Sequence, residues 1–222
     1  KYIREYYTSL FTIAEENIDM LCLTETWIAS DAPNEIKNNV APPGFSVVHK
    51  HRGSYDDKRG GGLALIYRNS LQCSQIFHPP TSEFEHLTTL LTNSKQQVLV
   101  LTIYRPPGQI THSFIQEFNH FLDSIVSTNH NFIICGDFNA PASSSSINST
   151  LQELLDELSF IQHVNTSTHF KGNILDLLIS HQDTPNLISN VTTHRLSYSD
   201  HYLVTGSISI TKPNHTYISS SY

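Results

Sequence analysis

The sequence predicts an α/β fold in which β-sheets of mixed strand direction are covered by helices. Short apolar runs typical of strands alternate irregularly with amphipathic runs typical of helices. Hairpins connect some of the strands, and no repeat of roughly 20 to 50 residues suggests a solenoid. The chain has 222 residues, of which 38% are hydrophobic and 15% charged, so it is expected to be globular.

The first half of the chain is predicted to contain one helix and five strands. Residues 2–16 carry apolar side chains at helical spacing and are expected to form the helix. A loop rich in Pro and Asn at 31–44, a charged loop at 50–59 and three glycines at 60–62 separate the later elements. The strands are expected at 18–23, 45–48, 63–67, 87–92 and 96–104, the last two as a hairpin.

The second half is predicted to contain two helices and three strands. Ser113-x-x-Gln116 resembles a capping box ahead of one amphipathic run, and Ser149-x-x-Gln152 opens another. The low-complexity run Ala142–Ser146 is expected to be a loop. The strands are expected at 132–135, 174–180 and 203–210, followed by a frayed tail from residue 211.

Composition narrows the possible functions. Lys and Arg number 13 against 20 Asp and Glu, and the net charge of −7 argues against a broad nucleic-acid surface. That objection weakens if carboxylates surround a bound cation, whose charge reverses the local sign. No apolar stretch approaches the roughly 20 residues that a membrane span needs, so no membrane partner is expected. Three cysteines without zinc or disulfide spacing favour a reducing, intracellular compartment.

Residues 131–141, NFIICGDFNAP, combine a buried strand with a polar end. The apolar run is typical of a strand covered on both faces. Alternate residues of an extended chain share a face, so Asp137 and Asn139 are expected on one side and Phe138 on the other. Gly136 would allow a close approach to the backbone. The strand is therefore expected to present a carboxylate and an amide side by side at its tip.

Other strand candidates also carry polar residues at their ends. They are Glu25, Tyr104 with Arg105, and the run Ser199, Asp200 and His201. Asp176 lies inside an apolar run, where an unpaired carboxylate would cost several kcal/mol, so a cationic or hydrogen-bonding partner is expected. One such residue is often only a turn former or a structural histidine. Together they are hard to attribute to turns and indicate a catalytic site.

Six segments carry a resemblance to a known family. In chain order they are LCLTETW (21–27), GGGLALIYR (60–68), IYRPPG (103–108), IICGDFNAP (133–141), ILDLLIS (174–180) and YSDHYLV (198–204). The ordered set resembles the endonuclease/exonuclease/phosphatase family, and more narrowly the apurinic-type endonuclease domain of LINE-like, non-LTR retrotransposons. The resemblance covers about residues 1–210 and leaves 211–222 as a tail or linker.

The resemblance implies a fold and a reaction. The fold would be the DNase I-like four-layer sandwich, with two stacked mixed β-sheets flanked by helices. The reaction would be metal-dependent nicking of DNA to leave a 3′-hydroxyl and a 5′-phosphate, with Mg²⁺ or Mn²⁺ as cofactor. In a retrotransposon that hydroxyl primes reverse transcription, so the implied partners are DNA and a reverse transcriptase segment of a longer polyprotein. A monomer located in the nucleus is expected.

The resemblance also implies roles for nine residues. Glu25 and Asp200 would hold the metal, which suits hard oxygen ligands. Asp137 would deprotonate the attacking water, and His201, paired with Asp176, would stabilise the transition state. The remaining implied roles are phosphate contacts by Tyr104 and Asn139 and substrate binding by Arg105 and Ser199.

The sequence departs from the family pattern at two places. The family begins with a strand carrying a metal-site asparagine, and residues 1–17 here already match the following helix. A central strand is therefore expected to be missing, and with it we expect weak metal binding, poor nicking and aggregation through the vacated position. The family's usual histidine after a glycine is Asn173. Two alternatives stay open: a phosphatase or phosphodiesterase acting on inositol phosphates or sphingolipids, and a catalytically inactive remnant that only binds DNA or protein.

Overall fold

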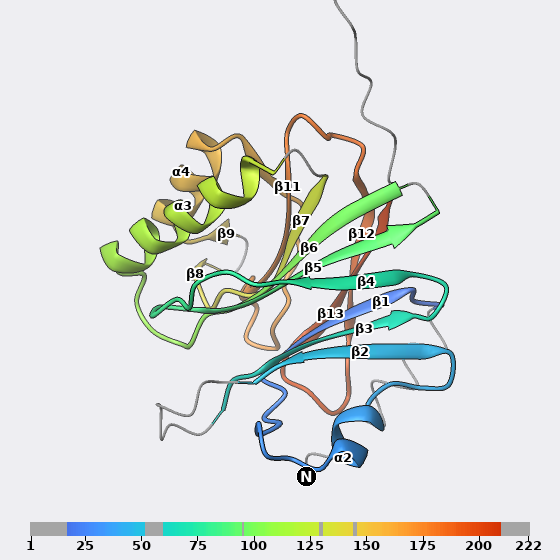
Figure 1. Cartoon of the computed structure of the whole chain (residues 1–222). Coiled ribbons are helices and arrows are strands. Elements are labelled where there is room, and N and C mark those ends of the chain that lie inside the picture. Colours follow the sequence, from blue (N-terminus) through green and yellow to red (C-terminus); the bar gives the residue numbers. More distant parts are fainter. Residues whose placement is uncertain (1–16, 52–59, 95, 129–130, 144–145, 210–222) are drawn as a thin grey trace, which may run out of the picture.

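A six-stranded sheet forms the centre of the computed structural model, which describes residues 17–51, 60–94, 96–128, 131–143 and 146–209 (Figure 1). Its neighbouring strands are antiparallel except for one parallel pair, β6 and β7, so the sheet is mixed. In spatial order the strands are β10 (Phe160–Gln162), β11 (Asp176–His181), β7 (Phe132–Asp137), β6 (Gln96–Tyr104), β5 (Glu85–Asn93) and β4 (Gln72–Ile76).

Three smaller sheets complete the β-structure. The three-stranded sheet is antiparallel throughout and packs against β5, β6 and β7 of the large sheet. Its strands are, in spatial order, β1 (Met20–Thr24), β3 (Leu63–Arg68) and β2 (Phe45–Lys50). The two remaining antiparallel pairs are β12 (Ile188–Arg195) with β13 (Tyr202–Ile208), and β8 (Pro141–Ser143) with β9 (Ser146–Ile147).

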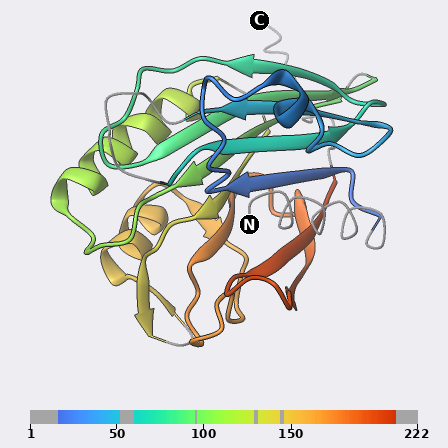
Figure 2. The same ribbon diagram turned by 90° about the horizontal axis from the view of Figure 1, so that it is seen from below.

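Two helices lie together beside the large sheet, as Figures 1 and 2 show. Helix α3 (His112–Val126) buries an apolar face that includes Phe114 and Phe118, and α4 (Ser149–Glu157) buries three leucines. The central strand β6 is buried over Val98–Tyr104, since the three-stranded sheet and the helices cover its two faces. This burial on both faces explains why β6 and β7 are continuous apolar runs in the sequence.

The expected sandwich of stacked sheets is present, but its helix layers differ from the expectation. In the described part of the chain, the helix beside the small sheet is the five-residue α2 (Asn34–Asn38), which contacts β2. The helix predicted at 2–16 and the tail predicted from 211 lie outside the described residues, as does most of the charged loop at 50–59. The expectation that a first strand is missing also lies outside the described residues.

Several local expectations are corrected. Helix α3 is capped by Thr111, whose Oγ1 accepts a hydrogen bond from the Phe114 amide at 3.0 Å, and not by Ser113. Helix α4 is capped by Asn148 in place of Ser149. In both helices the N-cap is the residue just before the first helical residue, where the backbone is still extended. A Ser inside the first turn has helical backbone angles and cannot cap the helix. The expected loop at 31–44 contains α2, and the expected loop at 142–146 is shortened because β8 and β9 extend into it from its two ends.

Five of the described strands were not expected from the sequence: β4, β8, β9, β10 and β12. β4 and β10 lie at the two edges of the large sheet, and β12 pairs only with β13. Edge strands need little apolar patterning because one side of their backbone is unpaired. The polar sequence QCSQI of β4 illustrates this. Among the described helices, none is long and apolar enough to cross a membrane.

Candidate active site

Three neighbouring strands place Tyr104, Asp137 and Asp176 in one row at the same end of the large sheet. Tyr104 is paired with Asp137 across β6 and β7, and Asp137 with Asp176 across β7 and β11. Residues directly opposite one another on adjacent strands share a face, so these side chains converge. Segments more than 30 residues apart in the chain are thereby joined, as the polar strand ends predicted.

Gly136 makes this row possible. The residue has a φ of +133°, which side-chain-bearing residues rarely adopt, and a Cβ added to it would lie 2.0 Å from the Ile103 carbonyl oxygen on β6. Only glycine therefore lets the ends of β6 and β7 lie this close.

The turn after β7 presents Asp137 and Asn139 together, as expected. The Asn139 backbone amide donates to Asp137 Oδ1 at 3.0 Å, and Asn139 Nδ2 donates to Asp137 Oδ2 at 2.9 Å. Phe138 points the opposite way and is fully buried, with its ring 5.6 Å from that of Phe118. Asp137 is only 5% exposed, and this burial, reinforced by the negative charge of Asp176, raises its pKa to about 7.

Asp176 has the partner that its position required. Its Oδ2 lies 2.9 Å from Nδ1 of His201, which comes from the loop before β13. Burial alone would lower the pKa of His201, but the hydrogen bond to Asp176 and the nearby carboxylates outweigh it and raise the pKa to about 9. His201 is therefore an imidazolium near neutral pH.

Glu25 joins the site from the small sheet. It follows β1 with a φ of +53°, and its Oε1 accepts a hydrogen bond from the Tyr104 hydroxyl. The next two amides, of Thr26 and Trp27, donate to the carbonyls of Gly62 and Gly61 at 3.0 and 2.9 Å, which anchors the loop. Burial and the adjacent Glu25 raise the pKa of Tyr104, so the phenol stays protonated.

Arg105 lies differently from the expected substrate contact. Its side chain is 4% exposed, and its guanidinium donates to the carbonyls of Phe138, Asn139, Gly108 and Gln109. Its own carbonyl accepts from Asn139 Nδ2 at 2.9 Å. A guanidinium with its donors turned to buried carbonyls supports the turn that carries Asp137 and leaves little to offer a ligand.

Asp200 and Ser199 are exposed on the loop before β13. Ser199 Oγ accepts a hydrogen bond from the His201 amide at 3.1 Å, which holds the loop around the imidazole. Asp200 faces a residue that the sequence analysis missed, His169, whose Nε2 lies 3.6 Å from Asp200 Oδ2. The segment THFKGN contained that histidine, but its pairing with the Ser199–His201 loop is a tertiary contact with no local sequence signal.

The donor set suits a hard divalent cation. Among the described residues, two groups have ligand atoms within 4.8 Å of one another: Asp137, Asp176 and His201, and His169, Asp200 and His201. Glu25 belongs to neither group but is near enough for its charge to raise the pKa of Asp137. Four of these side chains carry carboxylate oxygens, the ligands that Mg²⁺ and Mn²⁺ prefer: Glu25, Asp137, Asp176 and Asp200.

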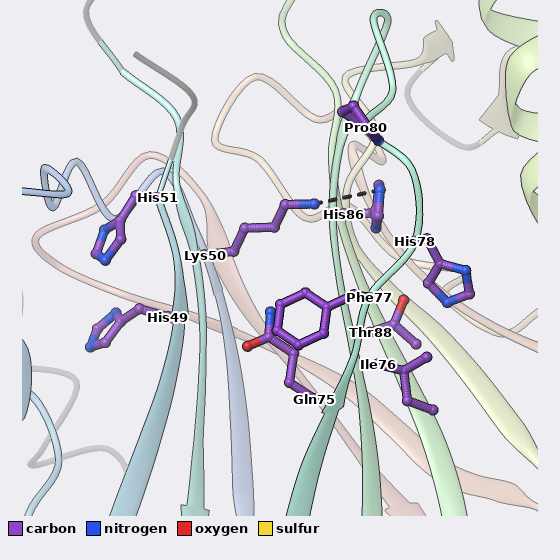
Figure 3. A pocket seen from close by; sticks show the side chains of 10 residues that line it. All are labelled: His49, Lys50, His51, Gln75, Ile76, Phe77, His78, Pro80, His86 and Thr88. Carbon is purple, nitrogen blue, oxygen red and sulfur yellow. Dashed lines mark hydrogen bonds between the residues drawn. The ribbon is translucent and has the colours of Figure 1, made fainter.

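A separate hollow of about 380 Å³ opens at the outer edge of the sandwich (Figure 3). Lys50 extends from β2 toward His86 on β5, and their nitrogens are 3.5 Å apart. Burial and the Lys50 charge lower the pKa of His86 to about 4, so its ring is neutral. None of the sequence-predicted site residues lines this hollow. The lining residues are His49, Lys50, His51, Gln75, Ile76, Phe77, His78, Pro80, His86 and Thr88.

The sequence model of the endonuclease/exonuclease/phosphatase family matches residues 2–201. The chain belongs to this family. The family comprises hydrolases of phosphoester bonds that typically depend on a metal ion, and the carboxylates and the His201–Asp176 pair agree with that chemistry. No curated protein matches the chain in sequence.

Solved structures share the fold at low sequence identity. The endonuclease domain of TRAS1, a telomere-specific non-LTR retrotransposon, has a TM-score of 0.69 and 15% identity, covering 91% of each chain. An AP endonuclease from Leishmania major has a TM-score of 0.68 and 16% identity, covering 90% of this chain and 81% of that one. The 3′ phosphatase NExo from Neisseria, bound to a product DNA hairpin, has a TM-score of 0.65 and 18% identity, covering 91% and 94%. The fold is therefore DNase I-like.

Proposed function

We propose that this member of the endonuclease/exonuclease/phosphatase family is a divalent-metal-dependent endonuclease that nicks DNA and leaves a 3′-hydroxyl and a 5′-phosphate. The observation that carries the proposal is the convergence of Glu25, Tyr104, Asp137 and the Asp176–His201 pair at one end of the sandwich. Phosphodiester hydrolysis needs a base for the water and cationic groups for the phosphate oxygens, and this set supplies both.

Asp137 is the proposed general base. Its carboxylate is buried and is held from one side by the amide and side chain of Asn139. A pKa of about 7 places it where a base is half ionised at neutral pH and still accepts a proton readily. In this proposal Asp137 takes the proton of the attacking water.

His201 is the proposed cationic partner of the phosphate. The hydrogen bond to Asp176 through Nδ1 fixes the orientation of the ring and favours its charged form. The imidazolium then stabilises the negative charge that builds on the phosphate oxygens. Tyr104, which is paired with Asp137 across the strands, and Asn139, which donates to it, are the proposed phosphate contacts. The exposed Ser199, which accepts from the His201 amide, is proposed to bind substrate.

Glu25 and Asp200 are the proposed metal ligands, since their carboxylates are exposed at the site. A bound Mg²⁺ or Mn²⁺ supplies Lewis-acid stabilisation of the phosphate and leaving-group oxygens. It also offsets the net charge of −7, which would otherwise oppose the approach of DNA.

The finer assignment is to a LINE-like, non-LTR retrotransposon. The order of the sequence motifs and the fold shared with a retrotransposon endonuclease domain support it. The proposed partners are therefore target DNA and a reverse transcriptase segment that would extend the 3′-hydroxyl, with a monomeric chain acting in the nucleus.

Supercoiled-plasmid nicking in Mg²⁺ tests the proposal. We expect the chain to convert supercoiled to open-circular plasmid slowly, and Asp137→Asn to lower that rate by roughly 10²- to 10⁴-fold, because the base is lost. Asp123→Asn is the matched control, since Asp123 is an exposed carboxylate on α3, and it should nick like the unsubstituted chain.

The ends and the substrate class are tested in the same experiment. Nicks with a 3′-hydroxyl and a 5′-phosphate are sealed by DNA ligase, whereas nicks with a 3′-phosphate are not. Bis-p-nitrophenyl phosphate and an inositol phosphate serve as small-ester substrates. Plasmid left intact while a small ester is hydrolysed would replace the DNA assignment with the phosphatase alternative, and equal rates for the Asp137→Asn variant would contradict the site.

A further inference from the structure

A short antiparallel bridge joins residues 168–170 to residues 200–202. It is centred on His169 and His201, whose rings lie 5.1 Å apart in an edge-on arrangement. Two backbone hydrogen bonds close it: Tyr202 N to Thr168 O at 2.7 Å and Phe170 N to Asp200 O at 2.9 Å. This bridge holds the backbone of His169 beside that of Asp200 and His201.

The hydrogen bonding of the His169 ring defines where its proton lies. Nδ1 accepts from the Lys171 backbone amide at 3.4 Å, so the neutral ring carries its hydrogen on Nε2. Nε2 lies 3.6 Å from Oδ2 of Asp200, a polar contact slightly longer than a hydrogen bond. The ring is buried, with 8% of the residue exposed, and therefore has little freedom to turn away.

The contact with His169 restricts the Asp200 side chain, which is otherwise 65% exposed. An exposed carboxylate samples several rotamers, and ordering it when a cation binds costs conformational entropy. A fixed donor beside one carboxylate oxygen reduces that cost and leaves the other oxygen available. Ligating carboxylates in metal sites are commonly held by hydrogen-bond donors.

We propose that His169 is a positioning residue of the active site, which holds the Asp200 carboxylate through Nε2–H in the orientation that receives the divalent cation. The inference rests on the proposed role of Asp200 as a metal ligand. Direct coordination by His169 is the rival interpretation. Coordination would require a lone pair on Nε2 and a hydrogen on Nδ1, and that hydrogen would face the Lys171 amide hydrogen.

Mn²⁺ binding to the full chain, measured by titration calorimetry after removal of metal, tests the inference. His169→Leu removes the donor and should weaken Mn²⁺ binding by about 10- to 100-fold. His169→Gln places an amide nitrogen near the position of Nε2 and should keep the affinity within about threefold, because a neutral donor is restored. The melting temperature of each metal-free variant is measured beside the affinity.

The matched control is the pair His181 and Asp183. Its Nδ1 and Oδ2 atoms are 3.4 Å apart, so it is a second partly buried histidine beside an exposed aspartate, away from the site. His181→Leu should leave Mn²⁺ affinity unchanged even if it lowers the melting temperature. If His169 had only a structural role, Mn²⁺ affinity would fall in proportion to the melting temperature in His169→Leu, His169→Gln and His181→Leu alike.

The possible outcomes separate this inference from the proposed function. Unchanged Mn²⁺ affinity in His169→Leu, with binding that Asp200→Asn still abolishes, would overturn the role of His169 alone. A loss of Zn²⁺ binding without loss of Mn²⁺ binding in both His169 variants would overturn it in favour of direct coordination. Mn²⁺ binding that is insensitive to Asp200→Asn would contradict the proposed function as well. In the metal-free chain, a long-range ¹H–¹⁵N spectrum should show hydrogen on Nε2, and an Nδ1–H form would contradict the inference independently of any metal.

Discussion

Asp137 and His201 keep their protons to unusually high pH, for different reasons. Asp137 is buried beside Asp176, and burial disfavours a charged carboxylate. His201 is partly buried, but the carboxylates around it favour the charged ring. The two pKa values, about 7 and about 9, leave an interval in which an ionised base and an imidazolium exist side by side. At this scale the site is an arrangement of a few charges whose spacing sets their protonation.

The raised pKa of His201 predicts how stability depends on pH in the metal-free protein. The group titrates at about 9 when folded and 6.5 by itself, so its contribution is complete below pH 6.5 and is lost as pH rises through 9. Because the side chain is 32% exposed, we expect the contribution to be about 2 kcal/mol.

Urea unfolding in EDTA at pH 6, 7.5 and 9.5 measures this contribution against His201→Gln. The difference in the free energy of unfolding between the two proteins should be largest at pH 6 and smallest at pH 9.5. A difference that grows with pH would contradict the assignment of a charged His201 paired with Asp176.

Secondary-structure elements act here mainly by bringing their ends together. β6, β7 and β11 each have an apolar middle, and their adjacent ends carry Tyr104, Asp137 and Asp176. Helix α3 supports this end from beneath, since Phe118 packs on Phe138. Arg105 adds hydrogen bonds to the same turn. The positions of the reactive groups are therefore set by strand pairing and by packing under the turn.

Gly136→Ala should disrupt the junction of β6 and β7. The new Cβ would lie 2.0 Å from the Ile103 carbonyl oxygen. The backbone of β7 would therefore have to shift away from β6. We expect a loss of roughly 3 kcal/mol or more in the free energy of unfolding, in the range of severe backbone strain and overpacking.

Urea unfolding compares this variant with Gly206→Ala. A Cβ at Gly206 meets the Leu178 side-chain methyl at 3.2 Å, and that methyl can move. The control should therefore lose about 1 kcal/mol or less. Equal stability of the two variants would show that β6 and β7 are not this close at their ends.

The molecule as a whole is acidic, which distinguishes it from proteins that hold DNA by a basic surface. It has 13 Lys and Arg against 20 Asp and Glu. Its proposed substrate is a polyanion, and a bound cation together with His201 would supply positive charge at the site. Specificity and affinity would then depend on one end of the sandwich more than on the general surface.

DNA binding should therefore be weakly dependent on monovalent salt and strongly dependent on the divalent cation. For a short duplex and the Asp137→Asn variant in Mg²⁺, we expect a log–log salt slope no steeper than about −3, corresponding to roughly three neutralised phosphates. EDTA should weaken binding by at least about tenfold, since the cation-dependent term is removed.

Fluorescence anisotropy at several KCl concentrations measures both effects, with Asp200→Asn in Mg²⁺ as the comparison for cation loss. A slope near −6, with no effect of EDTA, would indicate a broad basic surface and would contradict the arrangement described above.

Apolar strands with polar ends were enough to predict mixed β-sheets covered by helices, because apolar runs must be buried. They also indicated one catalytic site that includes Glu25, Asp137 and His201, and a partner for the buried Asp176. The stacked sandwich was implied by the resemblance to the family. Strand register and packing, which depend on contacts between distant segments, could not be inferred in this way. They assign Arg105 to the support of a turn, pair His169 with Asp200, and place the polar strands β4 and β12 at positions where local sequence carries little signal. A local sequence pattern predicts which side chains of a segment are buried and which are exposed. The hydrogen-bond partner of each buried polar atom depends on the tertiary structure.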